Sequence, residues 1–199
     1  MKADKEEITG IILAGGKSSR MGKDKGLCDF KGRALVSYAI ETLRPLCGNL
    51  MISANHFPEK YAEFQFPVVA DEIGNIGPMG GILSCLRKSH TQHNLVLSCD
   101  TPFVTTDVFR KIIEAVEKDQ VVAPAHHTFL IEPLSAYYNT NVINDMEHVI
   151  GEGNYKMMDF LKTIRFRTIS IDWQPFFTEY LFLNLNSPED LEKAQNLGL

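Results

Sequence analysis

Short hydrophobic runs rich in β-branched residues alternate along the chain with segments in which hydrophobic residues recur every three or four positions. The first pattern is typical of a buried strand, and the second of a helix with one buried face. The strands predicted in the first part cover residues 8–13, 50–53, 68–70, 95–98 and 121–123. The helices predicted between them cover residues 35–43, 77–86 and 105–118. This alternation indicates βα units around a mostly parallel sheet, so we predict an α/β fold with three layers, αβα.

The second part of the chain has a less regular pattern. Further elements are predicted as a strand over 134–138, helices over 142–150 and 155–164, and late strands over 167–171 and 181–185. A last helix is expected to begin at Pro188, because Ser187 is a favoured N-cap and proline is favoured at the first helical position. No repeat, low-complexity tract or Ser/Gly linker divides the chain, so we predict one domain over residues 1–199.

Composition and charge narrow the classes of protein that fit. The chain is 44% hydrophobic and 23% charged, which is typical of a domain that buries its own core. Its formal net charge of -5 argues against a general nucleic-acid surface, which needs an excess of Lys and Arg. The charged start at residues 1–7 carries no apolar h-region, and no later run approaches the length of a membrane span. We therefore expect a cytoplasmic protein with no nucleic-acid or membrane partner.

The residue types that form metal sites and disulfides give little signal. The cysteines are far apart and form no CxxC pair, at Cys28, Cys47, Cys85 and Cys99. We interpret them as reduced, mostly buried thiols. His126 and His127 are adjacent, so on a strand they would point to opposite faces and would not share a metal ion. They are interpreted as surface or packing residues.

A loop rich in glycine and basic residues follows the first predicted strand, between Gly15 and Lys25. Glycines allow backbone N–H groups to turn inward around an anion, and Arg20 and Lys25 supply positive charge for phosphate oxygens. Open α/β sheets bind ligands at this end of their strands. The spacing from Gly16 to Gly22 excludes a P-loop, and no GxGxxG follows the strand. A phosphate site is therefore predicted, with a solvated basic loop as the alternative.

Two carboxylates follow other predicted strands at the same edge of the sheet. Asp100 ends the fourth strand, and Pro102 turns the chain out of the sheet. Because Mg²⁺ needs only one or two protein carboxylates when phosphates supply the other oxygens, Asp100 is a candidate metal ligand. The alternative is a turn-forming aspartate. Asp71 ends the third strand before a glycine-rich stretch, which would let the backbone approach a base or ribose, or would form a plain flexible turn.

Two further groups of polar residues are candidates for ligand contacts. Asn184 and Asn186 would face one side of the predicted strand over 181–185, where their amides could bind phosphate, ribose or metal-bound water. The alternative is that this segment only ends a strand and caps a helix. The second group is basic, and we interpret it as a solvated helix face rather than a contact for an acidic substrate: Lys156, Lys162, Arg165 and Arg167.

Four motifs taken together resemble a known family. They read LAGGKSSRMGKDKGL at 13–27, DEIGNIGPMGGI at 71–82, CDTPF at 99–103 and NLNSPED at 184–190. In this order they are similar to the molybdenum cofactor guanylyltransferase (MobA) family, among the nucleotidyltransferases of Rossmann-like GT-A type. The first motif is specific to that superfamily. Its ending at residues 25–27, with the chain length, favours this family over sugar-phosphate relatives.

The resemblance implies that the two parts of the chain bind different substrates. Residues 1–105 would bind the nucleotide and residues 106–199 the acceptor, with the loose motif at 153–156 helping to hold the pterin. The catalytic residues would be Lys25, Arg20 and Asp100, with Asp100 as the Mg²⁺ ligand. The residues that bind the nucleotide and its metal would be Leu13, Ala14, Gly15, Gly16, Lys25, Asn55, Asp71, Asp100, Asn184 and Asn186.

The reaction implied by the resemblance is transfer of GMP from GTP to the terminal phosphate of molybdopterin, with release of pyrophosphate. GTP and molybdopterin would be the substrates and Mg²⁺ the cofactor. Proteins that deliver molybdopterin or mature molybdoenzymes are further partners that fit this role. Two alternatives remain open: a relative that uses another nucleotide or acceptor, such as a cytidylyltransferase or a sugar-phosphate enzyme, and a GTP-binding protein without catalysis.

Overall fold

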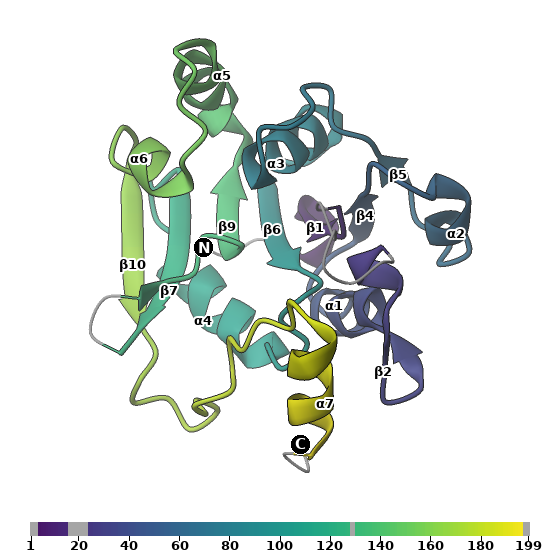
Figure 1. Cartoon of the computed structure of the whole chain (residues 1–199). Helices are drawn as coiled ribbons and strands as arrows, with labels where there is room; N and C mark the ends of the chain where they lie inside the picture. The colour runs from purple at the N-terminus through teal and green to yellow at the C-terminus, as the bar shows by residue number, and fades with distance from the viewer. Residues whose placement is uncertain (1–3, 16–23, 128–129, 197–199) are drawn as a thin grey trace.

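A computed structural model describes residues 4–15, 24–127 and 130–196. Its main sheet has eight strands, with β8 paired to β7 beside the path β10-β7-β9-β6-β1-β4-β5 (Figure 1). These strands are β1 (Ile8–Leu13), β4 (Asn49–Ser53), β5 (Val68–Val69), β6 (His93–Ser98), β7 (Val121–His126), β8 (Leu130–Ile131), β9 (Ser135–Asn139) and β10 (Phe166–Ser170). A separate hairpin pairs β2 (Asp29–Phe30) with β3 (Arg33–Ala34).

Most of the strands run in one direction. Strand β1 pairs in parallel with β4 and β6, β5 is parallel to β4, and β10 is parallel to β7. Strand β9 is antiparallel to both β6 and β7, which makes β6 and β7 parallel to each other. The carboxyl ends of six strands therefore meet at one edge of the sheet, where such sheets bind ligands.

Helices cover both faces of the sheet and give the three layers that were predicted. They are α1 (Leu35–Leu43), α2 (Pro58–Ala62), α3 (Pro78–Lys88), α4 (Thr106–Ala115), α5 (Ile143–Gly151), α6 (Met157–Leu161) and α7 (Pro188–Asn196). Helices α1 and α4 bury their apolar residues on one face, and α3, α5 and α6 on the other (Figure 1). Alternate residues of β1 divide in the same way, with Ile8 and Ile12 in the first core and Ile11 and Leu13 in the second.

One predicted strand is wrong. Residues 181–185 form no strand, because their backbone N–H groups bond to nearby turns and to a loop instead of a neighbouring strand. Leu181 donates to the Thr178 carbonyl at 3.1 Å, and Leu185 donates to the Asp100 carbonyl at 2.8 Å. The apolar side chains that suggested a strand, including Leu181 and Leu185, are buried all the same.

Smaller differences concern element ends and short elements. Helix α4 stops at Ala115 because Val116 is extended, with φ -65° and ψ 124°. Helix α6 is shorter than predicted and begins only at Met157, after the Asn154 side chain accepts a hydrogen bond from Lys156 N at 3.1 Å. The hairpin of β2 and β3, the short α2 and the two-residue β8 were not predicted, because elements this short carry no hydrophobic period.

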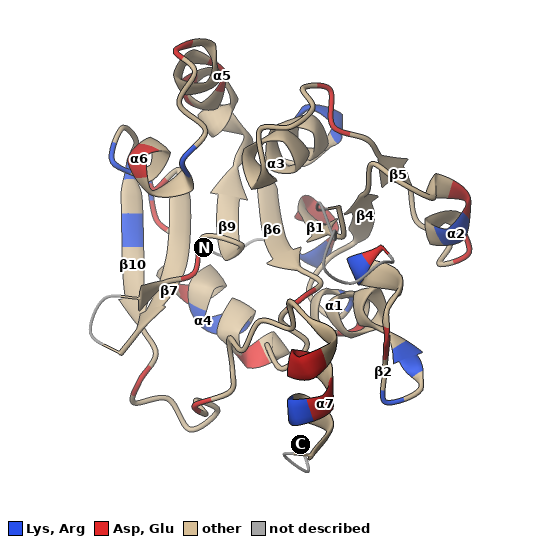
Figure 2. Ribbon diagram, viewed as in Figure 1, with Lys and Arg blue, Asp and Glu red and all other residues tan. Residues whose placement is uncertain are grey.

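The cysteines are buried thiols, as interpreted from their spacing, and the charged residues are spread over many elements (Figure 2). In the described part of the chain, Lys and Arg are interspersed with acidic residues over several elements (Figure 2). All four cysteines are buried, and none forms a disulfide. Burial raises the pKa of the Cys47 and Cys85 thiols to about 12, so these thiols stay protonated at neutral pH. Among the described residues, no helix is long and apolar enough to cross a membrane.

Candidate functional site

The end of β1 forms the centre of the candidate site. Ala14 N and Gly15 N both donate to the Ser53 carbonyl at the end of β4, at 2.9 Å each. On the other side, Cys99 N donates to the Leu13 carbonyl at 3.0 Å. These bonds hold the first residues of the glycine-rich loop between the ends of β4 and β6. Leu13 and Ala14 are buried and Gly15 is exposed.

Asn55 and Asp71 form a reciprocal pair that joins the ends of β4 and β5. Asn55 Nδ2 donates to Asp71 Oδ2, and Asp71 N donates to Asn55 Oδ1, both at 2.8 Å. The first turn of α3 packs against this carboxylate. A Cβ at Gly80 would lie 2.8 Å from the Ile73 carbonyl and 3.1 Å from Asp71 Oδ2, so a side chain there would displace the loop. Gly80 thus packs closely beside Asp71, whereas a Cβ at Gly74 or Gly77 would meet nothing within 4 Å.

Lys25 and Asp100 are in direct contact at the end of β6. Lys25 Nζ lies 2.6 Å from Asp100 Oδ2, with side chains 15% and 16% exposed, and also donates to Asn186 Oδ1 at 2.5 Å. With its amide turned so that nitrogen faces the carboxylate, Asn184 donates to Asp100 Oδ1 at 3.2 Å and to Oδ2 at 3.3 Å. Residues 75 or more positions apart therefore meet around one carboxylate.

The Asn184 side chain reaches Asp100 and the Asn186 side chain reaches Lys25 from a loop, and not from a strand as predicted. The Leu185 N–H between them donates to the Asp100 carbonyl at 2.8 Å, which fixes the loop against the end of β6. Asp190 in α7 then orients the loop, because its Oδ2 accepts from Asn186 N at 3.0 Å. That hydrogen bond, followed by one from the Ser187 side chain, lowers the pKa of Asp190. Ser187 Oγ also accepts from Asp190 N at 3.2 Å, as expected of an N-cap.

Two contacts near the lysine were missed by sequence reasoning. The buried Asp24 accepts hydrogen bonds from Gly26 N at 3.2 Å and from the Tyr61 hydroxyl of α2. Nothing in the hydrophobic pattern of α2 indicated that Tyr61 faces the loop. Of the other predicted residues of the loop, Gly16 and Arg20 lie outside the described residues.

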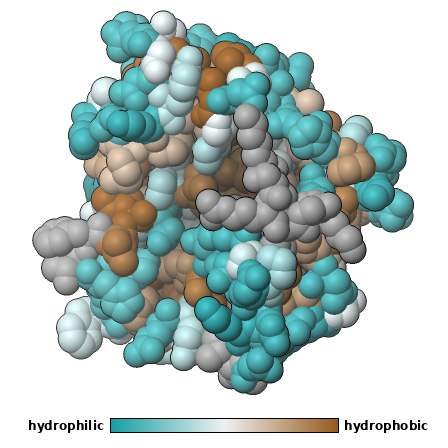
Figure 3. Space-filling view, viewed as in Figure 1, coloured by the Kyte–Doolittle hydropathy of each residue, from teal (hydrophilic) through white to brown (hydrophobic). Residues whose placement is uncertain are grey.

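Figure 3 shows the molecular surface hollowed over the end of β6, with hydrophobic residues in the floor of the hollow. Asp100 at this edge presents carboxylate oxygen, and Asn184 and Asn186 present amide groups. Carboxylate and amide oxygens are ligands that suit Mg²⁺. Within the described part of the chain, no three His, Cys, Asp or Glu side chains cluster as a complete metal site.

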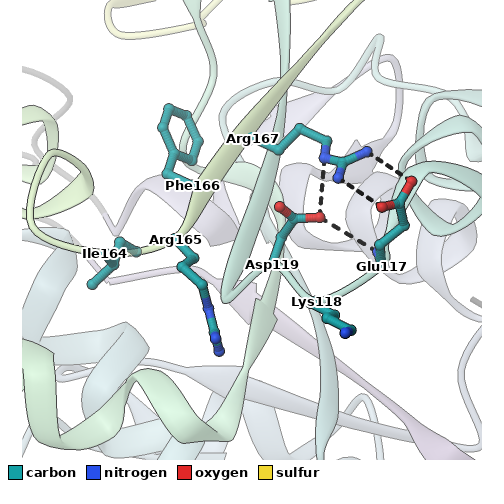
Figure 4. Close-up of a pocket in the computed structure, with 7 residues that line it drawn as sticks. All are labelled: Glu117, Lys118, Asp119, Ile164, Arg165, Phe166 and Arg167. Carbon is teal, nitrogen blue, oxygen red and sulfur yellow. Dashed lines mark hydrogen bonds and ion pairs between the residues drawn. The ribbon is translucent and has the colours of Figure 1, made fainter.

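The basic residues near β10 lie at the amino ends of β7 and β10, away from the carboxyl ends that carry the candidate site. Arg167 pairs with Glu117 at 3.1 Å and with Asp119 at 3.0 Å, beside the first residues of β7 and β10 (Figure 4). Lys162 pairs with Asp159 at 3.0 Å on α6. An open cavity of about 860 Å³ at this place is lined by Glu117, Lys118, Asp119, Ile164, Arg165, Phe166 and Arg167. Arg165 and Arg167 are thus remote from Asp100. They do not lie on a helix face as interpreted, because Arg165 directly precedes β10 and Arg167 belongs to it.

The two adjacent histidines differ from the simple strand expectation. Strand β7 ends at His126, and His127 adopts a left-handed conformation with φ 45°, so the two rings come within 4.9 Å of each other. His126 is buried, stacks on Phe182 at 4.9 Å and places Nε2 3.0 Å from Glu132 Oε1. His126 is a packing residue and His127 an exposed one, as interpreted from the sequence.

Comparison with solved structures supports the fold. A structure titled molybdopterin-guanine dinucleotide biosynthesis protein A, from Archaeoglobus fulgidus, superposes with a TM-score of 0.77 at 24% identity and covers 96% of this chain and 98% of its own. A 4-diphosphocytidyl-2C-methyl-D-erythritol synthase from Anaerococcus prevotii superposes with a TM-score of 0.74 at 13% identity, covering 98% and 96%. The predicted Rossmann-like nucleotidyltransferase fold is therefore confirmed.

Sequence comparison identifies the family. A molybdenum cofactor guanylyltransferase from Syntrophotalea carbinolica is 34% identical, over 94% of this chain and 90% of its own length. One from Vibrio parahaemolyticus is 32% identical over 94% of each chain. The family model described as the MobA-like NTP transferase domain matches residues 10–168, which include the end of β1, the Asn55–Asp71 pair and the Lys25–Asp100 contact. The chain belongs to the family of MobA-like NTP transferases.

Proposed function

We propose that the protein transfers GMP from GTP to the terminal phosphate of molybdopterin, with release of pyrophosphate. The observation that carries the proposal is the contact of Lys25 with Asp100 and Asn186 at the carboxyl edge of the sheet. A cationic side chain beside a carboxylate suits a substrate that brings both phosphates and a metal ion. The named relatives, at 34% and 32% identity over most of their length, favour GTP as the nucleotide.

The nucleotide-binding role belongs to residues from the first part of the chain, about 1–105. Leu13, Ala14 and Gly15 would contact the guanine nucleotide at the end of β1, and the Asn55–Asp71 pair its base or ribose. Support comes from the hydrogen bonds that bring the ends of β1, β4 and β5 together. Gly16 and Arg20, which lie outside the described residues, are proposed to continue the phosphate cradle. Residues 106–199 would bind the acceptor, with Asn184 and Asn186 returning to the nucleotide side.

Asp100 is the proposed Mg²⁺ ligand. Its carboxylate lies beside Lys25 and Asn184, and one such carboxylate suits a hard cation whose other ligands are phosphate oxygens. When bound, Mg²⁺ would neutralise charge on the phosphates and polarise the bond that breaks. Lys25 pairs with Asp100, and its ammonium would also bind the phosphate oxygens of the nucleotide.

The chemistry requires positioning and charge neutralisation rather than a covalent enzyme intermediate. An oxygen of the molybdopterin phosphate would attack the α-phosphorus of GTP, the bond from that phosphorus to the bridging oxygen would break, and pyrophosphate would leave. Lys25 and Arg20 would stabilise the negative charge that gathers on the phosphate oxygens. Asn184 and Asn186 would orient Asp100 and Lys25 for this step.

Two other functions fit the fold. A cytidylyltransferase or a sugar-phosphate enzyme would share the sheet and the phosphate cradle, and structural neighbours at 13% identity support the fold alone. A GTP-binding protein without catalysis would not need the Lys25–Asp100 contact, because nucleotide binding alone does not require both residues. We place the protein in the cytoplasm, with GTP and molybdopterin as substrates and with molybdopterin-delivering or molybdoenzyme-maturation proteins as partners.

Replacing the central residues tests the proposal. Lys25→Ala and Asp100→Ala should each lower guanylyl transfer about 100-fold or more, because each removes a charge that acts on the transition state. The melting temperature should stay close to that of the wild type. Matched controls are Lys111→Ala and Asp107→Ala, which remove exposed charges of α4. Unchanged transfer by either site variant would reject the proposal.

A further inference from the structure

Tyr61 is a fully buried side chain that contacts Ala14 and Asp24, on either side of the glycine-rich segment. It belongs to the short helix α2, is 0% exposed, and its hydroxyl donates a hydrogen bond to Asp24 Oδ1. The Tyr61 hydroxyl oxygen also lies 3.4 Å from the Ala14 carbonyl oxygen at the end of β1. One hydroxyl group therefore contacts the loop on both sides, at its start after Leu13 and at its end before Lys25.

The side chains of the consecutive residues Asp24 and Lys25 point in opposite directions. Asp24 is 7% exposed and turns inward to Tyr61, and the next residue, Lys25, reaches outward to Asp100 and Asn186. Asp24 is also the N-cap of the turn η2 (Lys25–Leu27), because its Oδ1 accepts from Gly26 N at 3.2 Å. The Asp24 carboxylate thus fixes the backbone of the turn that carries Lys25.

The packing leaves little room for this turn to move. A Cβ at Gly26 would overlap the Tyr61 hydroxyl oxygen and would lie 3.1 Å from the Ala14 Cβ, so the backbone of the turn rests directly on both. Burial, and next the hydrogen bond to Asp24, raise the pKa of Tyr61 well above its usual range. The hydroxyl therefore remains a protonated donor at neutral pH, and it satisfies a carboxylate that is itself buried.

We infer that Tyr61 is a positioning residue: through Asp24 it holds the Lys25 ammonium at the nucleotide phosphates. This inference rests on the proposed function, in which Lys25 binds those phosphates. Tyr61 touches no reacting atom, and its effect is indirect. Loss of its hydroxyl would leave the Asp24 carboxylate buried with one donor fewer and would free the turn that carries Lys25.

A double-mutant cycle tests the inference, with binding of GTP in the presence of Mg²⁺ measured by calorimetry. Tyr61→Phe should raise the dissociation constant about tenfold, the scale of one lost hydrogen bond to a charged group. Lys25→Ala should raise it by a similar or larger factor. The dissociation constant of the double variant should match that of Lys25→Ala within about twofold, because the Lys25 ammonium that Tyr61 positions is already absent. A merely structural role would make the two effects multiply.

The control variant is Tyr137→Phe. Tyr137 is also 0% exposed, and its hydroxyl lies 2.8 Å from His93 Nδ1 and 3.1 Å from Asn139 Nδ2, near the amino end of β6. It should lose stability as Tyr61→Phe does, with unchanged GTP binding. If Tyr61→Phe folds poorly, Asp24→Leu against Asp24→Asn gives the same comparison, because asparagine retains the acceptor oxygen and should bind GTP more tightly than leucine.

Three outcomes would overturn the inference, and they differ in what else they reject. If Lys25→Ala weakens GTP binding and Tyr61→Phe does not, or if the two effects multiply in the double variant, the positioning role fails and the proposed function stands. If Lys25→Ala itself leaves GTP binding unchanged, the inference fails, and the proposed function fails with it only if Lys25→Ala also leaves guanylyl transfer unchanged.

Discussion

Gly80 shows how a single residue without a side chain can determine the position of a candidate ligand group. Its place in the first turn of α3 brings the helix backbone against the Ile73 carbonyl and Asp71 Oδ2. The sequence indicated only that the stretch after Asp71 is rich in glycine. The contact that requires glycine is made by residues seven to nine positions earlier in the chain, and no local pattern could have identified it.

Gly80→Ala should therefore weaken GTP binding about tenfold, because the new methyl group would push the Ile73 loop and Asp71 away from their positions. Overpacking of this kind costs about 1–3 kcal/mol of stability, more than the gain in helix propensity. Gly151→Ala at the end of α5 is the matched control, since a Cβ there meets nothing within 4 Å. Calorimetric titration with GTP compares the two, and equal affinities would argue against a role for the Asp71 region.

Other residues of the candidate site could be predicted because their position after a strand carries information. Asp100 follows β6, Asp71 follows β5 and Leu13 ends β1, and parallel strands bring such ends to one edge. Asn55 was found only through the family resemblance. Tyr61 and Asp24 were missed because a contact between a buried tyrosine and a loop residue 37 positions away leaves no periodic signal.

At the scale of elements, the longer strands and the helices of nine or more residues were predicted well, and the segment 181–185 was not. Its alternating leucines fit a strand, but Leu185 N bonds to the Asp100 carbonyl and the segment lies as a loop over the end of β6. Helix α7, which follows it, lies beside α1 and β2 (Figure 1), where Ala194 and Leu185 join Phe30 and Leu35 in a small core. The segment is thus held at both ends, which places Asn184 and Asn186 near Asp100.

Asp190 should make part of the stability of the protein depend on pH. Its pKa is lowered on folding, chiefly by the Asn186 N–H, so its contribution is present above the ordinary pKa of 3.8 and is lost as the pH falls through the lowered value. Asp190→Asn should cost about 0.5–1 kcal/mol at pH 7, the scale of one capping interaction. Urea unfolding at pH 7 and at pH 3 measures the difference between wild type and variant. A difference that does not shrink at pH 3 would contradict this account.

At the scale of the whole molecule, the fold gathers residues from 13 to 186 at one edge of the sheet. The three-layer architecture could be predicted from the alternation of strand and helix patterns, because the apolar face of each helix has to pack against a face of the sheet. The antiparallel direction of β9 could not, since the pattern of a buried strand does not depend on the direction of its neighbours.

Substrate binding across this edge should stabilise the whole fold. The candidate site joins the ends of β1, β4, β5 and β6 to the loop before α7, so a ligand there binds only the folded chain. GTP and Mg²⁺ together at about 100 times the dissociation constant should raise the melting temperature by roughly 5–10 °C. Asp100→Ala should remove the part of the shift that depends on Mg²⁺. A shift with GTP alone that Mg²⁺ does not increase would argue against Asp100 as the metal ligand.

Guanylyl transfer to molybdopterin is tested by measuring pyrophosphate release with GTP, CTP, ATP or UTP in the presence of Mg²⁺ and molybdopterin. We expect release with GTP that requires molybdopterin, and at least tenfold less release with each of the other three nucleotides. Release with CTP in preference to GTP, or GTP binding without transfer to molybdopterin, would contradict it.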